Sequence, residues 1–231
     1  MKLRVKFSKN GPIKYIGHLD TMRYFQKAVR RAGIKVKYSG GFSPHQIMSF
    51  AYPLGVGMTT DGDYMDIEVE EASSSFELIE SMNAVMAEGI EVLDVVELPE
   101  KSQNAMASVA ASAYLVRFRD GKQPFFDLQK ASGYFNEAPT IPYVKKTAKS
   151  EIELDLKQSV YEFRVESDCE IYMMLDSSSG GNVKPSLVLD AIYAHFGEEL
   201  PEFATSVHRL DTYMRNEAGE LVPLLSAGVR F

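Results

Sequence analysis

The chain has 231 residues, of which 45% are hydrophobic and 25% are charged, and its formal net charge is −7. This composition is typical of a globular protein and excludes a largely disordered or fibrous chain. No apolar stretch reaches the ~18 residues that a membrane-spanning helix needs, and the first residues lack the apolar core of a secretory signal. The single cysteine, Cys169, excludes an internal disulfide and a self-contained iron–sulfur cluster. We therefore expect a cytoplasmic protein that contacts no membrane and holds no cofactor or metal.

The first hundred residues alternate between strand and helix patterns. Residues 2–7 alternate apolar with basic side chains, which predicts a half-buried strand with a basic outer face. Residues 19–32 carry apolar side chains at helical spacing before Gly33, which predicts a helix that ends there. Further strands are predicted at residues 34–38, 64–70 and 90–98, with a second helix from the serine run at residues 73–75 to Gly89. This order of elements is that of a ferredoxin-like split βαβ module.

The second half of the chain has a similar but weaker pattern. Strands are predicted at residues 113–119, 140–147, 151–156, 160–165, 170–175 and 207–215, and helices at residues 127–135 and 185–196. We therefore predict an α+β fold of two tandem ferredoxin-like modules, the second of them diverged. The first module is residues 1–98, the linker is residues 99–111, and the second α+β module is residues 112–231.

Charge is distributed unevenly along the chain. Residues 1–50 contain eleven Lys and Arg and one acid, Asp20, whereas residues 51–100 contain thirteen acids and no Lys or Arg. Two interpretations follow. The basic block forms a surface that meets phosphates, or the two blocks neutralise each other within one domain.

Several segments of the first module form a recognisable combination. They are Tyr15-Ile16-Gly17-His18-Leu19-Asp20, Arg30-Arg31-Ala32-Gly33, Tyr38-Ser39-Gly40-Gly41-Phe42-Ser43-Pro44-His45, Ser49-Phe50-Ala51-Tyr52-Pro53-Leu54-Gly55-Val56-Gly57 and Asp63-Tyr64-Met65-Asp66. Together they resemble the bacterial radical-SAM-linked protein family, a domain of unknown function found beside or fused to radical SAM proteins. In that family the loop usually reads Gly-Phe-Asn-Pro-His-Pro, so Ser43 and Gln46 depart from it. The resemblance implies a radical SAM protein as partner, and it implies no settled activity.

The same region supplies the candidate binding residues. Arg23, Lys27, Arg30 and Arg31 recur at helical spacing away from the apolar stripe, and no acid is seen to balance them. The glycines of the following loop permit close backbone approach, and its aromatic residues can stack on bases. The predicted substrate-binding residues are His18, Asp20, Arg23, Lys27, Arg30, Arg31, Tyr38, Gly41, Phe42, Ser43 and His45. A solvated helix face, an ordinary turn with Phe42 in the core, and His18 and Asp20 as helix caps are the structural alternatives.

Three functions are compatible with these residues. The preferred one is a non-catalytic accessory protein that binds a substrate, RNA in our interpretation, for a radical SAM partner enzyme. The second is a metal-independent endoribonuclease-like enzyme in which His18 and His45 act as acid and base. The third is a pure protein-interaction module. We favour the first because no third group is evident to orient either imidazole.

Overall fold

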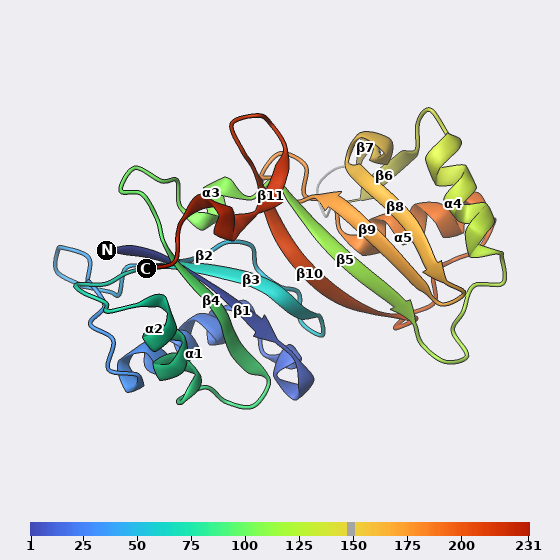
Figure 1. Ribbon diagram of the computed structural model, residues 1–231. Helices are drawn as coiled ribbons and strands as arrows, with labels where there is room; N and C mark the ends of the chain where they lie inside the picture. The colour runs from blue at the N-terminus through green and yellow to red at the C-terminus, as the bar shows by residue number, and fades with distance from the viewer. Residues whose placement is uncertain (147–150) are drawn as a thin grey trace. The chain divides into compact units, whose positions relative to one another are not determined.

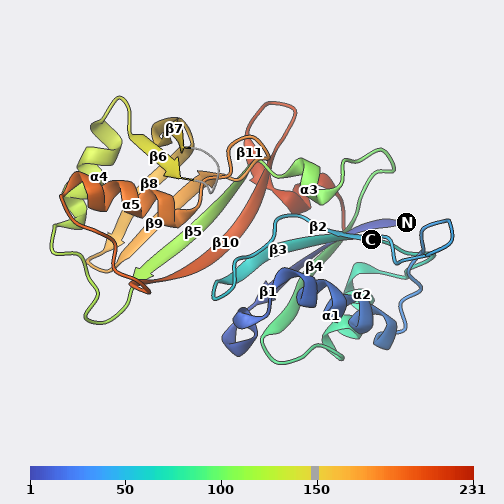
Figure 2. The ribbon, with the colours of Figure 1, turned by 180° about the vertical axis from the view of Figure 1, so that it is seen from behind.

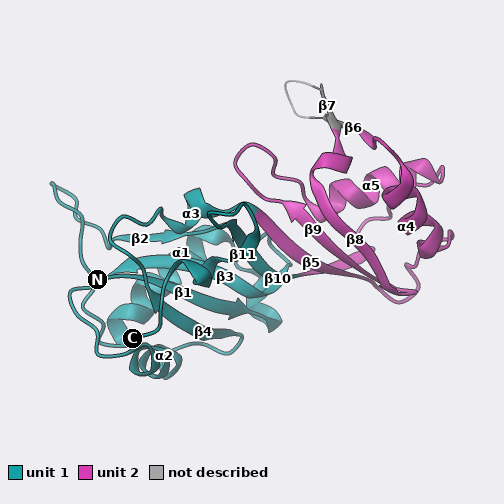
Figure 3. Cartoon of the chain, turned by 45° about the horizontal axis from the view of Figure 1, so that its top comes forward, with its two compact units in different colours: residues 1–110, 209–231 teal, residues 111–208 magenta. Residues whose placement is uncertain are grey.

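The computed structural model describes residues 1–146 and 151–231, which divide into two compact units (Figure 3). Unit 1 comprises residues 1–110 and 209–231, and unit 2 comprises residues 111–208. Unit 2 is therefore inserted in the sequence of unit 1. The C-terminal segment, which was predicted to belong to the second module, packs in unit 1 instead.

Unit 1 contains a mixed set of helices and antiparallel strands (Figures 1 and 2). Its elements are β1 (Lys2–Lys9), η1 (Gly11–Tyr15), α1 (His18–Arg31), β2 (Met48–Phe50), β3 (Thr59–Glu68), α2 (Ser75–Asn83), β4 (Ile90–Glu97), α3 (Ala105–Ser108), most of β10 (Thr205–Arg215), β11 (Leu221–Pro223) and η3 (Leu224–Ala227). β1 lies between β4 and β3 and is antiparallel to both. On its other side, β3 pairs with β2 near its end and with β10. These pairings give the strand order β4-β1-β3-β2 at one end of β3.

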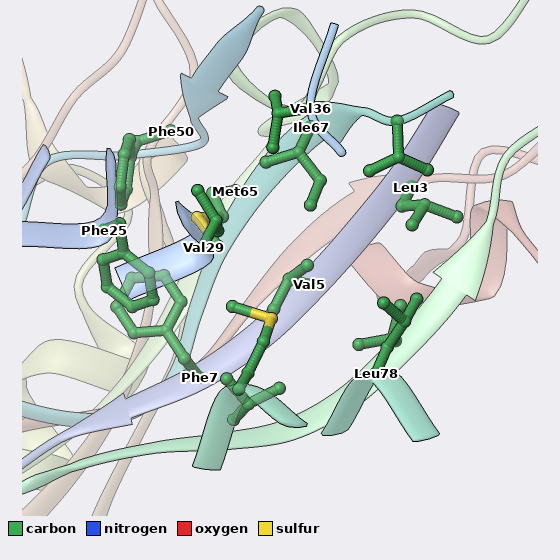
Figure 4. Close-up of a cluster of buried hydrophobic side chains, with 14 of the residues drawn as sticks. Leu3, Val5, Phe7, Phe25, Val29, Val36, Phe50, Met65, Ile67 and Leu78 are labelled. Atoms are coloured by element: carbon green, nitrogen blue, oxygen red, sulfur yellow. The ribbon is translucent and has the colours of Figure 1, made fainter. Parts of the chain in front are cut away.

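The core of unit 1 lies between this sheet and the two helices α1 and α2, which cover the same face of it (Figure 4). The alternation predicted for β1 is confirmed, because Leu3, Val5 and Phe7 are all fully buried. Phe25 of α1 packs against Phe7 with the ring centroids 4.6 Å apart. Each such side chain contributes about 1.5–3 kcal/mol through its removal from water, so the two helices are held on the sheet mainly by this cluster.

Unit 2 repeats the alternation of strands and helices. Its elements are β5 (Ala111–Phe118), α4 (Leu128–Glu137), β6 (Pro142–Lys146), β7 (Glu151–Asp155), η2 (Leu156–Gln158), β8 (Val160–Ser167), β9 (Glu170–Asp176), α5 (Pro185–His195) and the first residues of β10. β9 lies between β5 and β8 in an antiparallel sheet, whereas β6 and β7 form a separate two-stranded sheet. Thr147, which was predicted to end a strand, lies outside the described residues. The α+β class is confirmed, and the description of both units as ferredoxin-like modules stays a prediction.

The strand predicted at residues 34–38 is wrong. In this segment Val36 and Tyr38 make isolated bridges, and the strand that follows α1 and pairs with β3 is β2. The reason is local, because the backbone of residues 37–39 is hydrogen-bonded to residues 45–47. The second helix is also shorter than predicted, since α2 ends at Asn83 rather than near Gly89.

The basic outer face predicted for β1 is not exposed. Arg4 is fully buried, and its Nε and Nη2 atoms lie 2.8 and 3.0 Å from the two carboxylate oxygens of Asp66. Lys6 Nζ lies 2.7 Å from a carboxylate oxygen of Asp211. Arg4 also donates to the carbonyl of Leu224. The residues expected to form a linker, and those expected in the second module, therefore cover this face of the sheet.

Candidate nucleic-acid interface

The first helix exposes a basic side that we call the cationic face. It consists of four exposed residues, namely Arg23, Lys27, Arg30 and Arg31. The opposite side of α1 buries Phe25, Ala28 and Val29 in the core, and this burial fixes which side faces solvent. Leu19, which was predicted to belong to the apolar stripe, is instead 65% exposed.

The cationic face is only partly balanced by acids. Asp20 lies 3.3 Å from Arg23, so the prediction that no acid balances the stripe is wrong at this position. Arg30 and Arg31 donate to backbone carbonyls, the first within α1 and the second at Val85. No acid pairs with Lys27, Arg30 or Arg31 in the part of the chain that the structure describes. These three cations therefore keep their charge available to an anionic ligand.

Two neighbouring lysines are less available. Lys35 Nζ lies 2.6 Å from Glu71, and Lys37 Nζ lies 3.9 Å from Glu68. The hydrogen bond between Lys35 and Glu71 raises the pKa of the Lys35 ammonium and lowers the pKa of the Glu71 carboxyl. Part of the basic block is thus neutralised by the acidic block, as the alternative interpretation of the charge pattern proposed.

Neither His18 nor Asp20 caps the helix through its side chain. The residue at the N-cap is Gly17, and no side-chain hydrogen bond closes that end of α1. Asp20 lies in the first turn, where a negative charge favours the helix dipole. The structural alternative for Asp20, a carboxylate in the first turn that favours the helix dipole, is therefore confirmed, whereas His18 makes no cap hydrogen bond.

The loop after α1 forms a short projecting hairpin of residues 37–47, which we call the arm. Its two sides are joined by backbone hydrogen bonds from Ser39 to His45, 2.8 Å, and from Ile47 to Lys37, 2.9 Å. Gly41 at the tip has a backbone φ of +99°, a conformation that residues other than glycine rarely adopt. This turn leaves the Phe42 side chain fully exposed, so the alternative that placed Phe42 in the core is wrong. Tyr38 is half exposed, and Ser43 lies exposed at the tip.

The arm is attached to α1 beside the cationic face. Gln46 is buried, and its Nε2 donates to the carbonyl of Gln26 at 3.2 Å. Residues three and four apart on a helix are surface neighbours. The base of the arm therefore lies about one helical turn from both Arg23 and Arg30.

The two candidate imidazoles are held in different ways. His18 packs edge-on against Phe50, with ring centroids 5.5 Å apart, whereas His45 Nδ1 lies 2.8 Å from the Ser39 hydroxyl on the arm. Gln46 contacts the helix at Gln26, eight residues after His18, or about 12 Å along the axis. No hydrogen bond or ring contact joins the two imidazoles among residues 1–146 and 151–231, and each is held by a different neighbour, His18 by Phe50 and His45 by Ser39.

A buried ionic cluster near the start of α1 was missed from the sequence. Arg209 is almost fully buried, and its Nη2 lies 3.1 Å from Asp63 Oδ1 while its Nη1 donates to the carbonyl of Tyr52. Burial raises the pKa of the Asp63 carboxyl, and the Arg209 guanidinium opposes this shift. Burial also lowers the pKa of the Lys9 ammonium, which donates to the carbonyl of Ile16. Arg209 follows Asp63 by more than a hundred residues, so no local pattern indicates this pair.

The described residues contain neither a cluster of metal-binding side chains nor a membrane-spanning helix. Across residues 1–146 and 151–231, no group of three or more His, Cys, Asp or Glu side chains gathers in a position to hold a metal ion. Within the same ranges, no helix is both long enough and apolar enough to cross a membrane.

Comparison with known families gives one match over most of the chain. Residues 2–185 match the model of a family described as "Uncharacterized protein conserved in bacteria" (DUF2344). The chain belongs to this family. The DUF2344 match covers all of the cationic face and the arm, and it extends to the start of α5 in unit 2. A comparison with curated proteins finds no match.

Among solved structures, the chain is similar to one chain of the "Crystal Structure of a Cbf5-Nop10-Gar1 Complex". The TM-score is 0.50 at 10% sequence identity, over 91% of this chain and 48% of the other. This DUF2344 chain therefore spans about half the length of that neighbour. At this identity the likeness concerns the fold alone, and it agrees with the α+β class.

Proposed function

We propose that the protein is a non-catalytic accessory protein that binds RNA on unit 1 for a radical SAM partner enzyme. The observation that carries the RNA part is the cationic face of α1, where Lys27, Arg30 and Arg31 have no acidic partner among the described residues. Cations in this arrangement bind the phosphates of RNA and displace the counterions that surround them. This displacement provides affinity without sequence preference.

The arm supports single-stranded rather than duplex RNA as the ligand. A fully exposed Phe42 at its tip and a half-exposed Tyr38 offer ring faces to unstacked bases. Bases in a duplex are already stacked and cannot use such rings. The partner enzyme is proposed from the resemblance of the motifs around Gly17, Gly41 and Pro53 to the radical-SAM-linked family.

Charge reversal on the cationic face should weaken RNA binding. We expect Arg23→Glu with Arg30→Glu to raise the Kd for oligouridylate by about tenfold or more and to flatten the dependence of log K on log salt concentration. Filter binding at several salt concentrations measures both quantities. Neither side chain contributes to the core, so thermal unfolding should change little.

A matched control places the same charge change on unit 2. Arg117→Glu with Arg164→Glu alters two exposed arginines that pair with neighbouring acids. This variant should bind oligouridylate like the wild type. If both double variants bind equally well, the cationic face is not the site.

The arm variants distinguish the accessory protein from the endoribonuclease. The wild type should leave RNA intact without added metal, and Phe42→Ala should weaken binding by about fivefold or more, because one stacked base contributes about 1 kcal/mol or more. His45→Ala should at most reduce affinity. Gel analysis of end-labelled RNA checks for cleavage. Cleavage by the wild type that disappears in His45→Ala or His18→Ala would establish the enzyme and reject the accessory role.

A further inference from the structure

Two loops of unit 2 expose phenylalanine side chains that nothing in the described chain covers. Phe125, in the loop of residues 119–127 between β5 and α4, is 95% exposed, and Phe203, in the loop of residues 197–204 between α5 and β10, is 82% exposed. Aromatic side chains are common anchors of protein interfaces, because one ring buries a large apolar area in a partner.

The two loops are tied together at one end of unit 2. The Arg119 amide donates to the carbonyl of Ala204 at 2.9 Å, and the ring of Phe126 stacks on that of Phe196 with centroids 4.3 Å apart. Both loops meet the end of β5 in the two opposite views (Figures 1 and 2). Phe125 and Phe203 are the sequence neighbours of Phe126 and Ala204, so they lie on two loops that meet at this end of unit 2.

The backbone at Phe203 is strained. Its φ is +56°, in the left-handed region that a bulky residue adopts only at a cost in free energy. Glycine would relieve this strain, and yet the chain places a fully protruding aromatic ring there. Strain of this kind is characteristic of a side chain that is held in place for binding.

The charges around the two rings indicate what class of molecule they meet. The second loop carries three exposed acids, Glu198, Glu199 and Glu202, and no Lys or Arg. The first loop has two cations, Arg119 and Lys122, and two acids, Asp120 and Asp127, so its net charge is zero. The surface is therefore net negative, which repels phosphates and attracts basic groups.

We infer that these loops form a protein-docking surface whose partner is a basic peptide segment that carries aliphatic or aromatic side chains beside its Lys or Arg residues. Phe125 and Phe203 are the anchors, and the glutamates at the rim select a basic partner and set its orientation. This inference goes beyond the proposed RNA binding, since it concerns the other unit and another class of ligand.

The test uses the full chain and a phage-displayed library of random dodecapeptides. We expect selection of peptides that combine Lys or Arg with aliphatic or aromatic residues. The selected peptide should bind about tenfold or more weakly to Phe125→Ser and to Phe203→Gly, and more weakly as salt is added. Phe76→Ser is the matched control, because it removes a ring that is 68% exposed on α2 of unit 1 and should leave peptide binding unchanged.

Phe203→Gly separates binding from folding. Because glycine tolerates the left-handed backbone, this variant should unfold at the same temperature as the wild type or at a higher one while it loses peptide affinity. The inference is overturned if the library yields no specific peptide, if selected peptides are acidic, or if they bind both variants normally. It is also overturned if these rings mediate self-association or bind oligouridylate instead. Loss of RNA binding on unit 1 would leave this result unaffected, so the two proposals fail separately.

Discussion

Replacing Asp66 with alanine should destabilise unit 1 by about 3–5 kcal/mol, because it leaves the buried Arg4 guanidinium without its carboxylate. Arg4 is 0% exposed and Asp66 is 4% exposed, and two hydrogen bonds of 2.8 and 3.0 Å join them. Asp66 also accepts the amide of Ala105 at 2.7 Å. The variant therefore unpairs a buried charge and a buried backbone donor at once. Chemical denaturation measures the free energy of unfolding.

A second ion pair with the same geometry serves as the control. Arg230 donates two hydrogen bonds to Asp94, 2.9 and 2.7 Å, but its side chain is 69% exposed. Since water can solvate that guanidinium, Asp94→Ala should cost less than about 1 kcal/mol. Replacing both buried partners, as in Arg4→Met with Asp66→Leu, should recover much of the lost stability. Equal losses in Asp66→Ala and Asp94→Ala would contradict the role assigned to burial.

Substituting Gly62 with alanine should separate β10 from β3. A Cβ atom at this position would lie 2.3 Å from the Cα atom of Asp211 and 2.6 Å from the carbonyl oxygen of Leu210. Both are backbone atoms, so the clash is relieved only if the two strands move apart. That movement would stretch the hydrogen bond that the Thr212 hydroxyl donates to the Gly62 carbonyl. We expect a loss of about 3 kcal/mol, at the upper end of the usual cost of overpacking.

Hydrogen exchange localises this effect. In Gly62→Ala the amides of residues 209–215 should exchange faster, whereas those of β1 paired with β4 should change less. Gly40→Ala is the control, because nothing lies within 4 Å of its added Cβ and its φ is not positive. It should change stability by less than about 0.5 kcal/mol. Unchanged exchange in β10 of Gly62→Ala would show that the strands can accommodate the methyl group.

The periodic spacing of apolar residues predicted the individual strands and helices of unit 1. The apolar alternation of Leu3, Val5 and Phe7 identified the central strand, and the helical spacing of Phe25 and Val29 identified α1, because burial on one face imposes those periods. The return of the C-terminal segment to unit 1 could not be predicted, since it depends on contacts such as Arg4 with Leu224 across most of the chain. For the same reason Arg4 was expected in solvent.

The candidate site was predictable to a similar degree. The exposure of Arg23, Lys27 and Arg30 followed from helix geometry, and the pairing of Arg23 with Asp20 could have been found from their spacing of three residues. The position of the Phe42 ring could not be found, because it depends on how the arm turns at Gly41. The hydrogen bond from Gln46 to Gln26, which joins residues twenty apart, places the base of that arm beside the cationic face.

The insertion of unit 2 within unit 1 affects how the protein folds as it is synthesised. When residue 110 has left the ribosome, β3 still lacks β10, and Arg4 still lacks the carbonyl of Leu224. At 5–20 residues per second, the ribosome needs roughly 5–20 s to add the intervening residues of unit 2. During that interval the nascent chain exposes the unpaired edge of β3, a feature that promotes aggregation and makes chaperones useful. The ribosome completes unit 2 before it adds residues 209–231, so unit 1 is the later of the two units to become complete.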